Sequence, residues 1–423
     1  MHDNGSSLIG EKIGLATLLR NEGLRFLDLC DPCHGLDLAL KHSIKELPPI
    51  LLQFVQSISN HFSSSQKKAL LRRIQEEEGL KILYPKKLAH TRWLSLGQSL
   101  KRLIDIWESL VKYYDYRLEQ KSPTKTNKKK RKKHQIIENA NHEETSEKLD
   151  SKKINDLLNN ESFYLKMLLF SETVQVINKY NIRLQDQKLS ISGLKLNIHE
   201  CYNSILDFVI KPEFWDMNRS ELLKFDFQDW SVQDKLFLST EDFIASISAE
   251  ISLKFKALQP MTEEFQQEFV YDFYDYFGKM LNSLKEYLPL ENNLINALDF
   301  VELKDSPVIL KDKLKTFCEE FQLCQDEEAK KQLKNELLQI RSVKVEFYRN
   351  VSENILEMRE RIERLEHLVL IPRLVRFAES LPTSSATIEQ SFSNIKLIKT
   401  DLRNRLGELS LEGLVLVGQE FKS

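Results

Sequence analysis

The sequence predicts a mostly α-helical protein, and three observations support this fold class. Glycine and proline occur only 12 and 11 times in 423 residues, which is roughly half their usual share, so few positions break a helix. Charged residues make up 29% of the chain, as the solvated faces of amphipathic helices require. Apolar residues recur three and four positions apart along much of the chain, which is the period of a buried helical stripe. An all-β sandwich is therefore excluded.

The composition also narrows the functional classes. The chain has 61 Lys and Arg against 63 Asp and Glu, a net charge of −2, which excludes a uniformly basic nucleic-acid sleeve but not local basic patches. The five cysteines are too few and odd in number for a disulfide framework, so we expect a reducing compartment. Because no run of about 18 apolar residues occurs, we expect no membrane span. The first residues lack the apolar core of a secretion signal.

The first 60 residues resemble the interior of a domain. Residues 3–5 predict a loop, 9–20 a helix and 24–29 a short buried strand. Apolar residues four apart over 36–44 favour a further helix. The proline pair at 48–49 is expected to end or kink it.

Two helices are predicted next. Serines at 63–65 favour a helix start, the helix covers 66–78, and Gly79 closes it. An apolar stripe then predicts one long helix over 92–119, of about seven turns.

Residues 120–153 differ from the rest of the chain because they contain only four apolar residues, and we expect a disordered linker. Its first half carries six consecutive cations: Lys128, Lys129, Lys130, Arg131, Lys132 and Lys133. Such a run binds phosphates through counterion release, acts as a nuclear import signal, or is simply a solvated charge cluster. We favour the import signal, because a linker keeps it accessible. This interpretation implies an import receptor as a partner and a nuclear location.

The region 154–370 is again helical in pattern. Phenylalanines recur every fourth residue over 265–277, which indicates a helical aromatic stripe. Alternating Arg and Glu over 346–370 predict a solvated helix. Pro372 and a turn at 381–385 are expected to interrupt it.

A last helix is predicted to begin near Ala386. The chain after Leu406 is apolar, and exposed apolar surface commonly marks an interface. We therefore expect self-association through this end of the chain. The residues that we assign to the interface are Phe392, Ile395, Leu402, Leu406, Leu411 and Leu414.

Three positions have competing local interpretations. Cys30, Cys33 and His34 match a haem-attachment pattern, a partial zinc site, or a buried cysteine pair with a hydrogen-bonded histidine. The buried pair is favoured, since haem attachment needs export and zinc needs a second ligand pair. Trp93 reads locally as a buried anchor. Glu389 reads as a carboxylate stabilised by a helix N-terminus.

Four segments, taken in order, resemble the hAT superfamily of DNA transposases and its domesticated relatives. Residues 3–10 (DNGSSLIG) resemble the loop that bears the second catalytic Asp, and residues 31–39 (DPCHGLDLA) resemble the C/D-x-x-H motif. Residues 91–95 (TRWLS) resemble the Arg-Trp motif. Residues 381–406 are similar to the C-terminal signature, which carries the catalytic Glu and part of the dimerisation region.

The resemblance implies an RNase H-like core split by a large helical insertion. In this family three carboxylates hold two divalent ions for in-line phosphoryl transfer. Asp3 and Glu389 correspond to two of them and would be the catalytic and metal ligands. His34 would lie beside the scissile phosphate, and Trp93, preceded by Arg92, would stack on an extruded base. An active enzyme of this kind would use Mg²⁺ or Mn²⁺.

This sequence also departs from the family pattern. It lacks the first catalytic Asp, which the family carries upstream of the second, and the N-terminal zinc-finger DNA reader. Gln390 stands where the family commonly has Arg. With one carboxylate of three missing, we expect weak metal binding and no DNA cleavage by this chain.

The expected organisation has five contiguous regions. They are an incomplete RNase H-like core with an α/β remnant (1–60), a helical start of the insertion (61–119), the linker (120–153), the helical insertion (154–370) and the end of the core with the dimerisation region (371–423). The expected function is that of a transposase-derived protein that dimerises and binds DNA in the nucleus. A fragment of an active cut-and-paste transposase and an unrelated helical scaffold are the alternatives.

Overall fold

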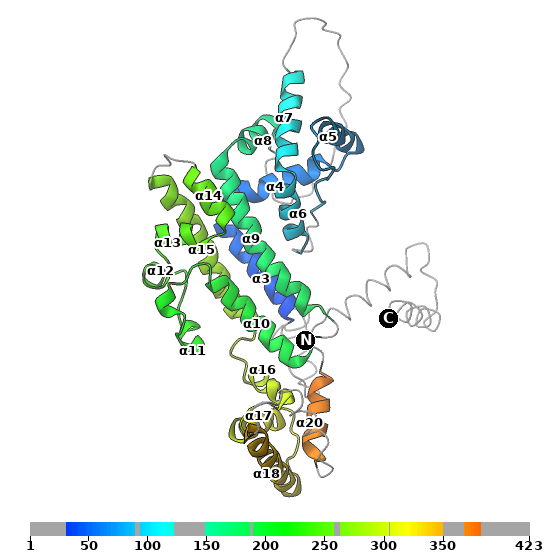
Figure 1. Ribbon diagram of the computed structural model, residues 1–423, viewed down its shortest axis with the longest axis vertical. Coiled ribbons are helices and arrows are strands. Elements are labelled where there is room, and N and C mark those ends of the chain that lie inside the picture. The colour runs from blue at the N-terminus through cyan, green and yellow to red at the C-terminus, as the bar shows by residue number, and fades with distance from the viewer. Residues whose placement is uncertain are drawn as a thin grey trace, which may run out of the picture. The chain divides into compact units, whose positions relative to one another are not determined.

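The computed structural model describes residues 31–88, 94–121, 149–186, 189–257, 263–303, 305–349 and 368–381, and these are mostly helical (Figure 1). The prediction of a mostly α fold is therefore confirmed. Within those ranges no strand forms, and Ile210 and Phe237 make an isolated antiparallel bridge. The strand expected at 24–29 lies outside the described residues.

The helices vary from single turns to rods of six or seven turns. In chain order, the first ten elements are α3 (Pro32–Ser43), η1 (Ile44–Glu46), α4 (Pro49–His61), α5 (Ser65–Glu77), α6 (Leu94–Asp105), α7 (Trp107–Lys121), α8 (Ser151–Leu158), α9 (Glu161–Leu184), α10 (Ile191–Leu206) and η2 (Pro212–Phe214). The others are α11 (Arg219–Leu222), α12 (Trp230–Leu236), α13 (Thr240–Ser246), α14 (Ala249–Ala257), α15 (Glu263–Tyr287), α16 (Asn293–Ala297), η3 (Leu298–Glu302), α17 (Pro307–Glu320), α18 (Glu327–Arg349) and α20 (Leu370–Glu379).

The described residues fall into two compact units, each built from segments far apart in the sequence. Unit 1 comprises those within Met1–Leu36, Tyr180–Asn203 and Leu284–Ser423. Unit 2 comprises those within Asp37–Lys179 and Ser204–Ser283. The regions expected from the sequence are contiguous instead. Local sequence patterns do not show which segments far apart in the chain pack together.

The core of unit 2 is built around the aromatic stripe of α15. Phe269, Phe273 and Phe277 are fully buried, which confirms the helical spacing expected from the sequence. Tyr276 on the same helix meets Phe170 of α9 edge to face, with ring centroids 6.4 Å apart. Burial raises the pKa of the Tyr276 phenol. The pairing of Phe170 with Tyr276 thus contributes to the contact between α9 and α15.

The helix predicted over 66–78 is confirmed within one residue at each end, because α5 spans Ser65–Glu77. Gly79 follows it with φ +66°, a left-handed conformation that favours glycine. Ser64 occupies the N-cap position but makes no capping hydrogen bond through its side chain. The serine signal therefore locates the start of the helix without supplying the cap.

The prediction of one helix over 92–119 is wrong in one respect. The structure divides this region at Ile106 into α6 and α7. The division is a local bend, since the amide of Ile106 still donates to the Arg102 carbonyl and that of Leu110 to the Ile106 carbonyl. At the bend, the Trp107 indole donates to the Leu158 carbonyl at 3.1 Å.

The limits expected for the linker over 120–153 also need correction. Gln120 and Lys121 complete α7. At the other end α8 begins at Ser151, where the Asp150 carboxylate accepts a hydrogen bond from the Lys153 amide at 2.7 Å. Buried Ile154 and Leu158 hold α8 in place. Residues 151–153 are therefore part of a helix and not of the linker. Residues 122–148 lie outside the described residues.

In unit 1, a buried carboxylate from α18 holds the start of α20. Glu336 is 2% exposed, and its oxygens accept hydrogen bonds from the amides of Val369, Leu370 and Ile371 at 3.0, 2.9 and 2.8 Å. These amides have no partner within a helix, and the helix dipole favours an anion there. The expectation that Pro372 interrupts a helix is wrong: it lies in the first turn of α20, where a missing N–H costs little.

An ion network joins α10, η3 and α17 of the same unit. Asp299 lies 2.8 Å from the Lys195 ammonium and 2.6 Å from that of Lys313, which also meets Asp305 at 2.6 Å. Burial disfavours the charge on Asp299, but the hydrogen bonds from both lysines outweigh it, so its pKa lies below the ordinary range. The same carboxylates, working against burial, raise the pKa of Lys313.

Candidate nucleic-acid interface

Of the residues that the sequence assigns to a site, the structure describes His34. The others lie outside the described residues: Asp3 and Glu389, Arg92 and Trp93, the cation run 128–133, and the interface residues Phe392, Ile395, Leu402, Leu406, Leu411 and Leu414. The approach of Asp3 to Glu389 therefore stays a prediction.

His34 lies half-buried in the first turn of α3. The turn is closed by Asp31, whose carboxylate accepts a hydrogen bond from the Cys33 amide at 2.7 Å. Gly35 packs tightly, because a Cβ there would lie 2.8 Å from the Tyr287 carbonyl oxygen at the end of α15. His34 thus belongs to a firmly held helix start.

The structure bears on part of the cysteine and metal hypotheses. Cys33 is buried, whereas Cys30 lies outside the described residues. In the ranges that the structure describes, no group of three His, Cys, Asp or Glu side chains is placed to hold a metal ion. Asp3 and Glu389, the ligands that the resemblance implies, lie outside those ranges.

The last described residues before Arg92 and Trp93 form a loop rich in lysine. We call residues 79–88, between α5 and the start of the next described segment, the basic loop. It has no helical structure, and Lys81, Lys86 and Lys87 on it are exposed.

The basic loop is held from α4 and α5. The Gln75 side-chain amide donates to the Leu83 carbonyl at 2.9 Å, and the Leu88 amide donates to the Ser59 hydroxyl at 2.9 Å. Pro85 is buried between these two points. A loop without regular structure is thereby given a defined course.

Further contacts join the basic loop to α6. The Arg102 guanidinium donates to the Tyr84 carbonyl at 3.3 Å, and the Lys86 ammonium donates to the Gln98 side-chain oxygen at 2.9 Å. Gln98 and Lys101 are one helical turn apart, so they share a face of α6. The Lys86 ammonium, held at Gln98, therefore lies about one turn of α6 from the exposed Lys101.

Helix α6 is itself fixed against α9. A Cβ added to Gly97 would overlap the side-chain amide of Asn178, so only glycine permits this approach. The Gln175 side-chain amide donates to the Gly97 carbonyl at 2.6 Å. The segment 89–93 therefore joins two anchored points, the end of the basic loop and the start of α6.

The charge on this surface is not neutralised locally. No carboxylate of the described residues pairs with Lys81, Lys86, Lys87 or Lys101, whereas Lys112 pairs with a glutamate at 3.3 Å. Unpaired surface cations are the groups that bind a phosphate backbone. Sequence reasoning missed this loop, although the Lys86–Lys87 pair just before Arg92 was a usable signal.

No protein-family model, curated protein or solved structure matches this chain. In the ranges that the structure describes, no helix combines the length and apolar character needed to cross a membrane.

Proposed function

We propose that this protein is derived from a hAT transposase, is catalytically incomplete, binds DNA in the nucleus and dimerises through its C-terminal region. The four hAT-like segments of the sequence support the ancestry. The described residues from 94 to 349 support it at the coarser level of fold, since they are mostly helical, as a long insertion between the second Asp and the Glu requires.

The observation that carries the DNA-binding part is the basic loop. Three lysines on this loop precede Arg92 and Trp93 in the sequence and Lys101 of α6 follows them, and no carboxylate of the described residues pairs with any of the four. The lysines supply contacts to phosphates, which are independent of base sequence. Trp93 supplies a π-face on which a base stacks, and such stacking also tolerates any base.

The nuclear location and the dimer rest on sequence. The six-cation run 128–133 suits an import signal. The apolar chain after Leu406 suits an interface. Neither part of the proposal requires a metal ion.

Anisotropy of a fluorescent DNA duplex tests the proposed interface. Lys86→Glu combined with Lys87→Glu removes two phosphate contacts, so we expect affinity to fall by about 10-fold or more at moderate salt. Lys41→Glu combined with Lys45→Glu is the matched control, because these exposed lysines of α3 and η1 lie in the same unit. Equal losses in both variants, or no binding by the unmodified chain, would contradict the proposal.

Cleavage assays test the catalytic part. With Mg²⁺ or Mn²⁺ and a terminal-repeat duplex, we expect no strand cleavage by residues 1–423, because the resemblance supplies them with counterparts of two of the three metal-binding carboxylates, Asp3 and Glu389. Cleavage that Glu389→Ala abolishes would instead identify an active transposase.

A further inference from the structure

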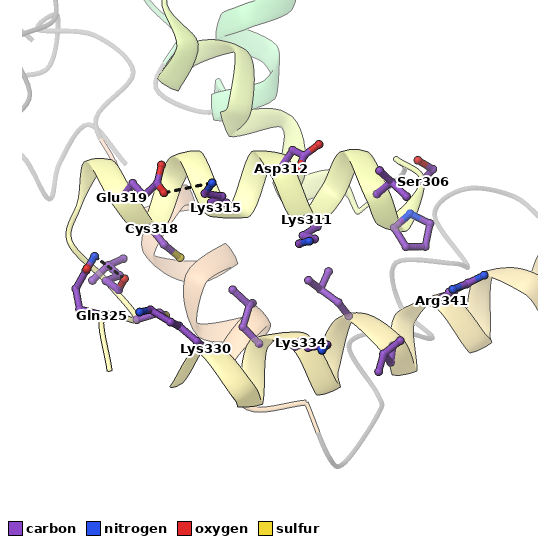
Figure 2. A pocket seen from close by; sticks show the side chains of 17 residues that line it. Ser306, Lys311, Asp312, Lys315, Cys318, Glu319, Gln325, Lys330, Lys334 and Arg341 are labelled. Carbon is purple, nitrogen blue, oxygen red and sulfur yellow. Dashed lines mark hydrogen bonds and ion pairs between the residues drawn. The ribbon is translucent and has the colours of Figure 1, made fainter. Parts of the chain in front are cut away.

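Unit 1 contains an open groove between α17 and α18 (Figure 2). Its volume is about 1200 Å³. The 14 residues of α17 correspond to a length of about 21 Å at 1.5 Å per residue. The groove therefore has the length of a short peptide segment rather than of a compact small molecule.

The groove is lined with apolar side chains. Cys318 and Leu337 are buried at its base, with half-buried Leu333 beside them. Val308 and Leu338 also line it and are 71% and 53% exposed. Exposed apolar side chains around one hollow mark a binding surface.

Cations surround this apolar lining. Lys311, Lys334 and Arg341 line the groove and are exposed, and no carboxylate of the described residues pairs with any of them. Figure 2 shows Lys311 on α17 and Lys334 on α18 lying at the space between the two helices. Two further lysines of the groove are paired with glutamates of their own helices, at 3.7 and 2.8 Å. Five cations against two carboxylates, Asp312 and Glu319, line the groove, so its chemistry suits a partner that is both apolar and acidic.

The width of the groove is fixed by α20. Glu336 of α18 binds the first amides of α20. Phe317 of α17 packs against Phe377 of α20, with ring centroids 5.9 Å apart. Because one short helix is tied to both walls, the groove is preformed and loses little conformational entropy when it binds.

One segment of this chain has the complementary chemistry. Residues 406–421 (LGELSLEGLVLVGQEF) contain eight apolar side chains from Leu, Val and Phe, three glutamates and no cation. The other acidic stretches differ, since 138–150 has few apolar residues and 353–366 alternates Arg with Glu. The segment 406–421 lies outside the described residues, so its sequence alone supports the match.

We propose that the groove of each copy receives residues 406–421 of a second copy, so that two reciprocal contacts close the dimer. Apolar side chains of the segment would cover Leu337, Leu338 and Val308, and its glutamates would pair with Lys311 and Lys334. Reciprocal exchange satisfies two-fold symmetry, in which one patch of each copy meets its complement on the other. This inference rests on the proposed dimerisation and assigns it a receiving surface.

Reach does not decide between a second copy and the same copy. The 25 residues from Leu381 to Leu406 extend to about 85 Å at most, which is enough for either arrangement. The experiment must therefore separate the two.

Charge reversal with mixing makes this separation. The groove variant is Lys311→Glu with Lys334→Glu, and the segment variant is Glu408→Lys with Glu412→Lys. We expect the unmodified full chain to be a dimer in sedimentation at micromolar concentration. Each variant alone should dimerise at least about 10-fold more weakly, because like charges then face each other. An equimolar mixture should restore a dimer, since opposite charges meet at one contact and the native pairs at the other.

A matched control and three outcomes make the result decisive. Lys224→Glu with Lys331→Glu changes the net charge equally at exposed lysines that do not line the groove, and we expect its dimer to remain. If the unmodified chain is a monomer, the proposed dimerisation itself fails. If it is a dimer that neither reversal weakens, the groove assignment alone is overturned. If a chain that carries both reversals forms the dimer again but the mixture of the two variants does not, the segment binds the groove of its own copy. The exchange between copies is then overturned.

A native thiol supplies an independent readout that does not depend on folding of the variants. Cys324 lines the groove and is half-buried. Burial and the neighbouring Cys324 raise the pKa of Cys318 to about 12, so Cys318 remains a poorly reactive thiol. We expect iodoacetamide to modify Cys324 at least about 3-fold more slowly in the unmodified chain at dimer-forming concentration than after dilution to the monomer, because the docked segment excludes the reagent. Equal rates would contradict the docking.

Discussion

The basic loop of unit 2 and the groove of unit 1 carry similar charge but differ in what lies beneath it. On the loop, unpaired lysines project from a backbone pinned by hydrogen bonds to Ser59 and Gln75. In the groove, unpaired cations surround an apolar base that includes Leu337. A phosphate backbone needs only the cations, whereas an apolar base stays exposed to water unless an apolar partner covers it. Local apolar lining, rather than charge, therefore distinguishes the surface proposed for protein docking from the surface proposed for DNA.

A substitution at Glu336 tests whether the two regions are independent, and we expect its effect on stability to exceed that of the other substitutions. Glu336→Ala removes the carboxylate that binds three amides of α20, so we expect unit 1 to lose about 3–5 kcal/mol of stability. Urea unfolding followed by circular dichroism measures this loss. Glu327→Ala is the control, since Glu327 is exposed at the start of the same helix.

DNA affinity of the Glu336→Ala protein should change by less than about 2-fold, because Glu336 and the basic loop belong to different compact units and share no hydrogen-bond partner among the described residues. A collapse of DNA binding together with unit 1 would show that the comparison of two separate regions is wrong.

Salt should separate the two surfaces next. Four lysines that each contact one phosphate give a slope of about −3.6 in log affinity against log salt, or roughly 150-fold between 50 and 200 mM. Dimerisation should weaken by less than about 10-fold over the same range, because burial of apolar surface is not screened. Titrations of the duplex and sedimentation at both salt concentrations provide the comparison, and parallel losses would remove the distinction.

A smaller effect concerns the platform beneath the basic loop. Gly97→Ala places a methyl group on the Asn178 amide, so we expect a loss of about 1–3 kcal/mol, with weaker DNA binding and an unchanged dimer. Gly193→Ala is the control, because its Cβ would meet the flexible tip of Leu189. Thermal unfolding and duplex anisotropy of both variants measure the outcome. Undisturbed DNA binding in Gly97→Ala would mean that α6 does not position the interface.

The smallest effect depends on pH and should appear only in unit 1. The lowered pKa of Asp299 means that its stabilisation is present above about pH 4 and is lost as pH falls through the folded-state value. The raised pKa of Lys313 means that its contribution persists until pH rises above about 10.5 and is lost beyond the folded-state value.

Asp299→Asn should therefore cost about 1–2 kcal/mol at neutral pH, and less near pH 3, because the Asp299 carboxylate of the unfolded chain is largely protonated there and the stabilisation is reduced. Urea midpoints at the two pH values supply the measurement. A cost that is the same at both would mean that the ion network contributes no pH dependence. The basic loop, held by uncharged acceptors, should show no such acid transition.

Local patterns are predictable from the sequence, whereas long-range partners are not. The limits of α5 and the stripe of Phe269, Phe273 and Phe277 follow from spacing alone, because a helix is encoded within a few residues. The role of Glu336 depends on amides 33 to 35 positions later, and the Asp299 partner Lys195 lies 104 positions away. No window of sequence contains both members of such a pair.

The same reasoning explains the errors. Pro372 predicts a helix end when the sequence alone is considered, because a proline is tolerated only if it lies in the first turn. Here the helix starts at Leu370, where Glu336 binds the first amides. At the candidate interface, His34 lies on a helix, as the spacing over 36–44 indicates. The basic loop escapes the same search, since its three lysines follow no helical period.

The most direct measurement compares both charge-reversed surfaces in one DNA titration. We predict that Lys86→Glu with Lys87→Glu weakens duplex binding by about 10-fold or more, whereas Lys311→Glu with Lys334→Glu leaves it within about 2-fold. If the groove variant binds the duplex much more weakly and the loop variant keeps its affinity, the assignment of the two surfaces is contradicted.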